Sequence, residues 1–82
     1  MAWTVYMLRC RGGSLYTGIA IDLPTRLAAH QAGTASAYTS SRRPVRLVYH
    51  EPQPTRSAAL RREAALRRLS RAAKLTLVRE AQ

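Results

Sequence analysis

Acidic residues are scarce in this sequence. Four Asp and Glu stand against 14 Lys and Arg, which gives the 82-residue chain a formal net charge of +10 at pH 7. A surplus of positive charge this large on so small a chain favours a polyanionic partner, most often nucleic acid, with an anionic membrane surface as the other option. Charge names a class of partner and no chemistry, so the chemistry has to come from a few polar residues.

Cysteine is nearly absent, and so are long apolar runs. The lone Cys10 has no second cysteine for an internal disulfide or a thiolate metal site, which excludes a disulfide miniprotein and a zinc finger and favours a reducing compartment. No apolar stretch approaches the roughly 20 residues of a membrane span, and no basic segment precedes an apolar one at the start. We therefore expect a cytoplasmic protein with no membrane segment and no disulfide-linked partner.

Hydrophobic residues nevertheless make up 46% of the chain. That fraction is enough for a packed core and argues against a disordered basic tail. A chain of this length has room for one core, so we expect a single domain over 1–82.

Two β-prone segments open the chain. Trp3 to Cys10 carries β-branched and aromatic residues on both alternate faces, which indicates a central strand covered from two sides. Gly12 and Gly13 can take the positive φ of a tight turn, and Leu15 to Ala20 resumes the extended pattern. The sequence therefore predicts a β-hairpin over Trp3 to Ala20.

A short helix and a loop are expected next. Asp22 is well placed as an N-cap and Gly33 as a C-terminal stop, which predicts a helix over Leu23 to Ala32. The segment 33–44 is rich in Ser, Thr, Ala and Gly, and this composition is typical of a surface loop.

The second half of the chain predicts one strand and two helices. Alternation over Val45 to Glu51 indicates a half-buried strand that closes before two prolines. From Thr55 onward an apolar face opposes an arginine-rich one, and Ser70 can cap a new helix, so we expect a break near Leu69. The order β-β-α-β-α-α predicts an α+β fold, a small three-stranded antiparallel sheet flanked by helices.

A few polar residues are candidates for chemistry. Arg26 and His30 lie four apart on the predicted helix, so both side chains can act on one point. Glu63 is the only acidic residue among eight basic ones between positions 56 and 79, and it lies beside the apolar face of its helix. An inward carboxylate needs a partner or a cation. Each residue also has a purely structural interpretation. Arg26 and His30 could lie on a solvated helix face, and Glu63 could form an ion pair with a neighbouring arginine.

Together with Tyr6 and Tyr16, these residues suit phosphodiester cleavage. A divalent cation on the carboxylate neutralises developing charge, an arginine binds a phosphate oxygen, and a histidine or tyrosine positions or deprotonates water. Histidine suits the base at neutral pH, whereas tyrosine needs an adjacent cation. From the residues alone this stays one possibility.

The ordered pattern resembles the GIY-YIG nuclease superfamily. Thr4-Val5-Tyr6 and Tyr16-Thr17-Gly18 lie ten apart across the hairpin and are followed by Arg26, His30 and Glu63. The resemblance extends from Val5 to about Leu77. Within the superfamily, the sequence is most similar to the small, stand-alone bacterial members, often called the YhbQ-type group. The sequence departs from the pattern at Thr4 and Ile19 and contains no asparagine for the late Asn of larger members.

The resemblance implies a role for each residue of the set. Glu63 would hold one divalent cation, Mg²⁺ or Mn²⁺. Tyr6 and Tyr16 would lie at the attacking water and the scissile phosphate, and Arg26 would clamp that phosphate. His30 would act as general base or orient a tyrosine that does so. Nucleic-acid contacts are expected from Tyr38, Arg42, Arg43, Arg71 and Lys74.

Three functions from different classes follow. The leading one is a metal-dependent, structure-selective endonuclease in DNA repair or recombination, with DNA favoured over RNA and the protein on the nucleoid when bound. The alternative is a nucleic-acid-binding module on the same scaffold with little or no turnover. The third is membrane-surface binding by the basic C-terminal segment, ranked last because the core needs its small apolar face.

Overall fold

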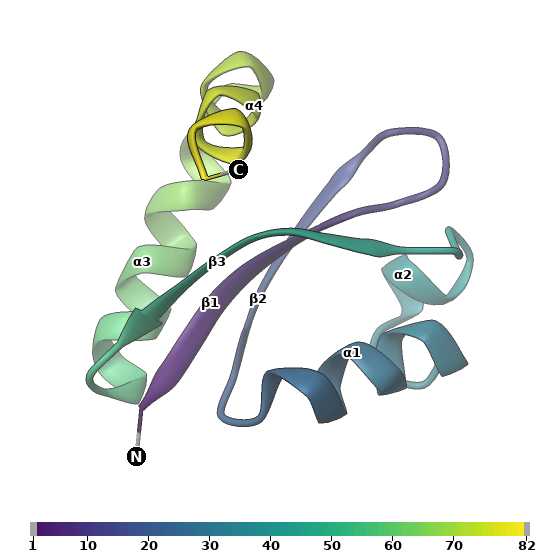
Figure 1. Cartoon of the computed structure of the whole chain (residues 1–82), viewed down its shortest axis with the longest axis horizontal. Coiled ribbons are helices and arrows are strands. Elements are labelled where there is room, and N and C mark those ends of the chain that lie inside the picture. The colour runs from purple at the N-terminus through teal and green to yellow at the C-terminus, as the bar shows by residue number, and fades with distance from the viewer. Residues whose placement is uncertain (1, 82) are drawn as a thin grey trace.

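A three-stranded antiparallel sheet forms the centre of the molecule, as the computed structural model of residues 2–81 shows (Figure 1). The strand order is β2-β1-β3, so the first strand of the chain is the central one. The elements are β1 (Trp3–Arg9), β2 (Leu15–Ala20), α1 (Leu23–Ala32), α2 (Ala37–Ser40), β3 (Arg46–Gln53), α3 (Arg56–Arg68) and α4 (Arg71–Glu80). The expected α+β class and the three-stranded sheet are confirmed.

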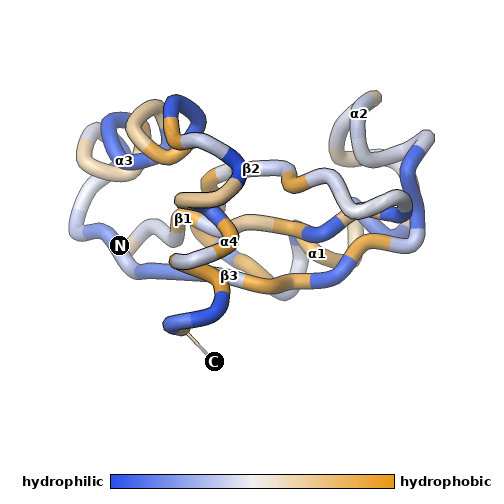
Figure 2. Tube along the Cα trace, turned by 90° about the horizontal axis from the view of Figure 1, so that it is seen from above, coloured by the Kyte–Doolittle hydropathy of each residue, from blue (hydrophilic) through white to orange (hydrophobic). Residues whose placement is uncertain are grey.

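Helices cover both faces of the sheet. On one face Tyr6 and Leu8 of β1 pack against Leu27 of α1, and on the other face Val5 packs against Leu66 of α3. Figure 1 shows α1 and α2 on one side of the strands and α3 and α4 on the other. Seen from above in Figure 2, hydrophobic stretches run along the strands and recur on the helices that pack against them. Alternate residues of β1 therefore serve two separate apolar clusters.

The hairpin forms where the glycine pair predicts it. Gly12 and Gly13 have φ of 91° and 94°, values that only glycine adopts without strain. The turn sets a register in which Tyr6 lies opposite Gly18. This register brings the two tyrosine motifs of the sequence to the same part of the sheet.

Helix α1 begins and ends at its predicted caps. The Asp22 carboxylate accepts a hydrogen bond from the backbone N–H of Thr25, and Gly33 ends the helix in the left-handed region at φ 82°. Ser70 similarly accepts from the backbone N–H of Ala73 and starts α4, so the predicted break near Leu69 is confirmed.

Two local predictions need correction. The segment expected to be a loop contains the one-turn helix α2, whose N-cap Ser36 accepts a hydrogen bond from the backbone N–H of Thr39. Strand β3 continues through Pro52 to Gln53, so it closes before the second proline, Pro54, but not before the first. Because β3 lies at the edge of the sheet, a proline there costs no hydrogen bond to a further strand.

No helix within residues 2–81 is long and apolar enough to cross a membrane.

Candidate active site

A buried chain of hydrogen bonds joins β1, α1 and α2. Tyr6 Oη lies 2.7 Å from His30 Nε2, and His30 Nδ1 lies 2.8 Å from Thr39 Oγ1. The exposed fractions of Tyr6, His30 and Thr39 are 1%, 1% and 0%. Both imidazole nitrogens are therefore occupied inside the protein, and the ring is held in one orientation.

Burial keeps the hydrogen-bonded side chains of Tyr6 and His30 neutral. It raises the pKa of the Tyr6 phenol, with a smaller contribution from Tyr16, and it lowers the pKa of His30, with Arg26 adding to the effect. A neutral imidazole donates at one nitrogen and accepts at the other, so the hydroxyls of Tyr6 and Thr39 play opposite roles. His30 is thus suited to fix the direction of the Tyr6 hydroxyl.

Gly18 lets the Tyr6 hydroxyl lie against β2. A Cβ atom at this position would lie 2.6 Å from Tyr6 Oη and 3.2 Å from an edge carbon of the Tyr16 ring. Real Cβ atoms essentially never make a contact as short as 2.6 Å, and 3.2 Å is tighter than most, so the position of the Tyr6 hydroxyl depends on glycine at this position and Tyr16 would have to shift slightly.

An aromatic stack leads from the buried chain to the surface. The Tyr16 ring meets His30 edge-on at 5.2 Å between centroids and stacks on Tyr38 at 6.0 Å. The guanidinium of Arg42 covers the Tyr38 ring at 3.9 Å from its centroid. Tyr6 is buried, Tyr16 half-buried and Tyr38 38% exposed, so the stack is graded from core to solvent.

Arg26 places a free positive charge beside this group. Its side chain is exposed, and the ion pairs formed among residues 2–81 engage Arg62 and Arg67 instead. Burial remains the larger cause for both groups, but the charge of Arg26 partly opposes the rise in the pKa of Tyr6 and adds to the lowering of the pKa of His30. The guanidinium is therefore close to the buried chain and available to an anionic ligand.

Glu63 approaches the same phenol from α3 on the other side of the sheet. Its charge contributes to the raised pKa of Tyr6, and its side chain is 17% exposed, in agreement with the inward orientation expected from the helical pattern. Arg67 Nη2 lies 3.2 Å from Glu63 Oε2 and also donates to the backbone carbonyl of Thr17 at 3.1 Å. Arg67 thereby ties the carboxylate to edge strand β2.

The donor set around Glu63 suits a cation shared with a ligand. No group of three or more His, Cys, Asp or Glu side chains with the arrangement of a metal site occurs in the described part of the chain, residues 2–81. Mg²⁺ usually keeps several waters and is held by one or two carboxylates together with substrate phosphates. A single inward carboxylate near Arg26 and the tyrosines fits that mode of binding, so the residues present are compatible with one divalent cation.

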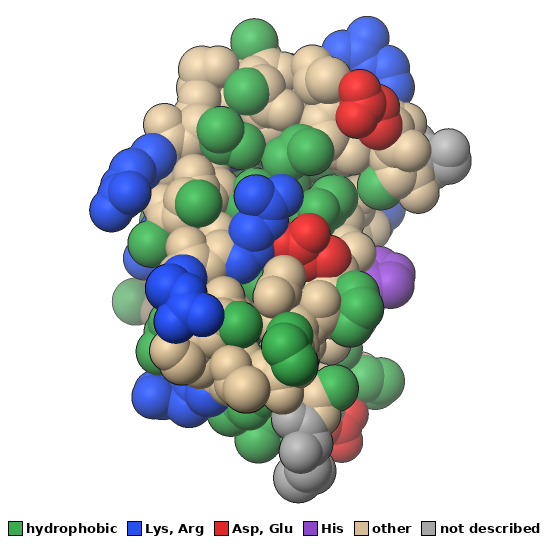
Figure 3. Space-filling view, turned by 90° about the vertical axis from the view of Figure 1, so that its left-hand side faces the viewer, with side chains coloured by type: hydrophobic (Ala, Val, Ile, Leu, Met, Phe, Trp, Pro, Cys, Tyr) green, Lys and Arg blue, Asp and Glu red, His purple; other side chains and the backbone are tan. Residues whose placement is uncertain are grey.

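The remaining basic candidates differ in how far they are free. Arg43 donates to the carbonyls of Ser40 and Gln31 and packs over Gly33, so it holds the loop around α2 together. Arg71 donates to the carbonyl of Gly13 in the hairpin turn. Lys74 is half-buried on α4. Figure 3, which faces the α3 and α4 side, shows basic groups spread over this surface.

Thr39 and Gly18 contact candidate residues although neither is in the candidate set. Thr39 follows Tyr38, which the sequence predicts as a nucleic-acid contact. A threonine gives no chemical signal by itself, whereas its place three residues after the N-cap Ser36 does indicate a fixed side chain. The second histidine of the chain, His50, is exposed on β3 and lies outside this group.

Comparison with known proteins identifies the family of the chain. The family model described as the GIY-YIG catalytic domain matches residues 2–76. A UPF0213 protein of Cupriavidus pinatubonensis is 47% identical over 73 residues, covering 89% of this chain and 81% of that protein. A UPF0213 protein of Staphylococcus saprophyticus is 46% identical over 76 residues, covering 93% of each.

A solved structure shows the same fold. The solution NMR structure of the UPF0213 protein BH0048 from Bacillus halodurans superposes with a TM-score of 0.61 at 40% sequence identity, covering 95% of this chain and 83% of that one. GIY-YIG domains are nuclease domains that generally use divalent metal ions. The chain therefore belongs to the GIY-YIG family, among its small bacterial UPF0213 members.

Proposed function

We propose that this protein is a divalent-metal-dependent endonuclease that hydrolyses phosphodiester bonds in DNA and selects its substrate by structure. The observation that carries the proposal is the half-buried Tyr16, packed against the buried Tyr6–His30–Thr39 chain. A free guanidinium and an inward carboxylate lie within electrostatic reach of the same tyrosine cluster. Phosphodiester hydrolysis needs these groups together, whereas a simple binding surface does not.

Each residue then has a defined task. Arg26 binds a nonbridging oxygen of the scissile phosphate and stabilises the charge that develops on it. Tyr16 is the tyrosine that contacts the attacking water, because Tyr6 and His30 are 1% exposed. His30 holds the Tyr6 hydroxyl toward Gly18 and Tyr16, so it is a positioning residue and does not accept the proton of the water itself.

Glu63 would hold the divalent cation, Mg²⁺ or Mn²⁺. When bound, the cation supplies Lewis-acid stabilisation of negative charge at the phosphate. Arg67 occupies Glu63 Oε2, which keeps the carboxylate oriented along the edge of β2. Tyr38 and Arg42 extend the site outward and offer a ring face and a charge to the substrate strand.

DNA in the cytoplasm, on the nucleoid, is the proposed substrate, and repair or recombination is the proposed setting. The support is the net charge of +10, which supplies phosphate affinity without sequence preference. A second candidate function is a DNA-binding module with little turnover. It is favoured by the ion pair with Arg67, which already neutralises Glu63.

A cleavage panel distinguishes the two functions. Purified protein with Mg²⁺ or Mn²⁺ is incubated with flap, branched, nicked, single-stranded and duplex DNA, beside the variants Glu63→Gln and Arg26→Ala. Glu80→Gln and Arg79→Ala are matched controls, because both residues are exposed on α4. We expect wild type and controls to cut a branched or flap substrate and both site variants to lose at least about 100-fold in rate.

Binding is measured in parallel by fluorescence anisotropy of labelled DNA without metal. If wild type binds every substrate and cuts none, the protein is the binding module. In that case Glu63→Gln should bind as tightly as wild type or more tightly, since it removes a negative charge from the site.

A further inference from the structure

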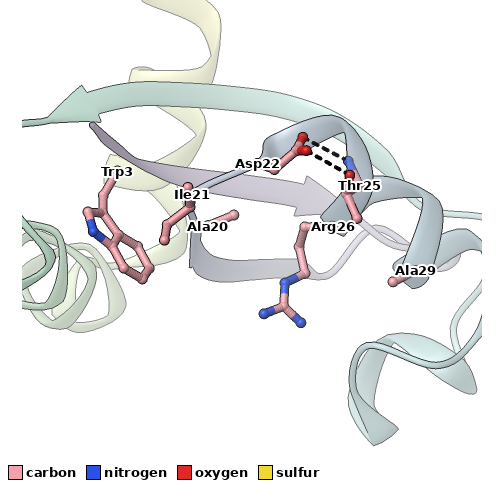
Figure 4. A pocket seen from close by; sticks show the side chains of 7 residues that line it. All are labelled: Trp3, Ala20, Ile21, Asp22, Thr25, Arg26 and Ala29. Carbon is pink, nitrogen blue, oxygen red and sulfur yellow. Dashed lines mark hydrogen bonds between the residues drawn. The ribbon is translucent and has the colours of Figure 1, made fainter. Parts of the chain in front are cut away.

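A hollow of about 320 Å³ lies beside the candidate active site. Figure 4 shows Trp3 and Arg26 extending toward the same side of the molecule, with Ala20 and Ile21 between them. The rest of the lining comes from the N-cap of α1, Asp22, and from Thr25 and Ala29 within that helix. Arg26 belongs both to this hollow and to the proposed phosphate site, so a ligand held by its guanidinium has the hollow next to it.

The lining suits a flat, uncharged group with apolar faces. The indole of Trp3 is half-buried, and Ile21 is 46% exposed, so an aromatic ring and an aliphatic side chain are offered to a ligand. Asp22 disfavours a second phosphate inside the hollow because its carboxylate is anionic. Its two oxygens already accept from the backbone N–H and the hydroxyl of Thr25, which fixes the carboxylate at the rim.

Positive charge surrounds the hollow on the Trp3 side as well. The guanidinium carbon of Arg56 lies 5.9 Å from the Trp3 ring centroid. A nucleotide has an uncharged, aromatic base attached to anionic phosphates, and this combination matches an apolar hollow bordered by arginines. A volume of about 320 Å³ lies at the small end of the range for ligand sites, about 300–1,000 Å³, which suits a single base.

We propose that the hollow formed by Trp3, Ile21 and Arg26 receives one unpaired nucleobase of the substrate strand, which stacks on Trp3 while the adjoining phosphate is bound by Arg26. This assignment rests on the proposed function for the identity of the nucleic acid. It gives the protein a physical basis for preferring DNA with unpaired nucleotides beside the cut, because a base within a duplex cannot enter without being unstacked.

Trp3 itself reports on the site, because it is the sole tryptophan of the chain. Its fluorescence is titrated with DNA in buffer containing a chelator, so that no turnover occurs. Two probes are compared: a duplex with a short single-stranded gap, and the same duplex with abasic residues throughout the gap. We expect strong quenching and tighter binding with the base-bearing gap, by about fivefold or more in Kd, and weak quenching with the abasic gap.

Two outcomes overturn the proposal. One is equal quenching and equal affinity for the two gapped probes. The other is unchanged Trp3 fluorescence when anisotropy of labelled DNA shows that the base-bearing probe is bound. Neither depends on a protein variant, so loss of folding cannot obscure the result.

Variants then locate the base. Ile21→Ala should weaken binding of the base-bearing gap and leave the abasic gap unaffected, whereas Leu60→Ala, which alters a similarly exposed apolar residue on α3, should change neither. Trp3→Phe should keep most of the base-dependent affinity, since it preserves an aromatic face. Equal effects of Ile21→Ala and Leu60→Ala would count against the hollow.

The outcome is separable from that of the nuclease proposal. Base-dependent quenching by a protein that cuts no substrate would contradict the proposed nuclease activity and support the hollow as a nucleobase site. Cleavage together with base-independent quenching would support the proposed nuclease activity and contradict the hollow as a nucleobase site.

Discussion

The contact between Gly18 and the Tyr6 hydroxyl is the tightest constraint on a single residue in the site. An added Cβ at 2.6 Å from Oη forces Tyr6 away from its position against β2. We expect Gly18→Ala to lower the free energy of unfolding by about 1–3 kcal/mol, the usual range for overpacking, and to abolish cleavage. Thermal melting followed by circular dichroism and the cleavage assay measure the two effects.

Gly12→Ala is the matched control for that substitution. Gly12 has a positive φ of 91°, which favours glycine, but a Cβ there meets nothing within 4 Å. It should lose stability through backbone strain and retain cleavage. A Gly18→Ala protein that cuts at the wild-type rate would contradict the proposed role of the Tyr6 hydroxyl.

His30 makes stability depend on pH in a definite direction. Burial and Arg26 lower its pKa in the folded protein, so the unfolded chain takes up a proton at this residue at a higher pH than the folded chain does. Its effect on stability is therefore absent above about pH 6.5, and stability falls as the pH drops from there toward the lowered pKa.

Chemical denaturation at about pH 7.5 and about pH 5 tests this dependence. Wild type should lose stability at the lower pH, and His30→Gln should show a smaller loss. His50→Gln should behave as wild type, because His50 is exposed. The same loss in all three proteins would assign the pH dependence to other groups.

At this scale the sequence predicts chemical types better than contacts. Tyr6, His30 and Glu63 stand out because phenol, imidazole and an isolated carboxylate have distinctive chemistry in a basic chain. Thr39 does not stand out, since its role exists only through a partner nine residues away and a helix that brings the two together. The proposed roles of the candidate residues stay predictions until the variants are assayed.

Among the elements, α2 is small but connects the loop to the site. Ser36 caps it by accepting from the backbone N–H of Thr39, and the two hydroxyls lie 3.0 Å apart. We expect Ser36→Ala to cost about 1 kcal/mol of stability, the usual value of an N-cap, and to reduce cleavage by loosening Thr39 beneath His30. Thermal melting and single-turnover cleavage provide the readouts.

Ser40→Ala is the control within the same helix. Ser40 donates its backbone N–H to Ser36 and accepts from Arg43 at its carbonyl, so loss of its hydroxyl should leave melting temperature and rate near wild type. If both variants behaved alike, the cap of α2 would have no part in holding the site.

The longer elements follow from local signals, and the exceptions have tertiary causes. Positive-φ glycines, the Asp22 and Ser70 caps and the Gly33 stop act through neighbours in the chain, so their effects can be read from sequence. Helix α2 spans only one turn and depends on contacts with α1. Such tertiary contacts cannot be predicted from the local sequence. Strand β3 extends past Pro52 because of its edge position in the sheet.

For the molecule as a whole, the net charge of +10 predicts DNA binding that weakens steeply with salt. Each phosphate contact adds about 0.9 to the slope of log K against log salt on duplex DNA. We expect Lys74→Ala to reduce that slope by about one contact. Arg62→Ala should leave the slope unchanged and lower stability, because Arg62 is paired with Glu51.

Anisotropy titrations over a series of salt concentrations give these slopes. Equal slopes for wild type and Lys74→Ala would remove Lys74 from the set of DNA contacts. A reduced slope for Arg62→Ala would show that Arg62 contacts DNA phosphates despite its ion pair with Glu51.

The position of β2 at the edge of the sheet has a consequence for solubility. Among residues 2–81 the strand that carries Tyr16 and Gly18 pairs with β1 alone. An unpaired strand edge is a template for adding a strand from another copy of the chain. Arg67 donates to the carbonyl of Thr17 in this strand and brings a charge to it. Arg67, which orients Glu63, therefore also disfavours pairing of this strand with another copy. Loss of the Arg67 side chain would promote aggregation.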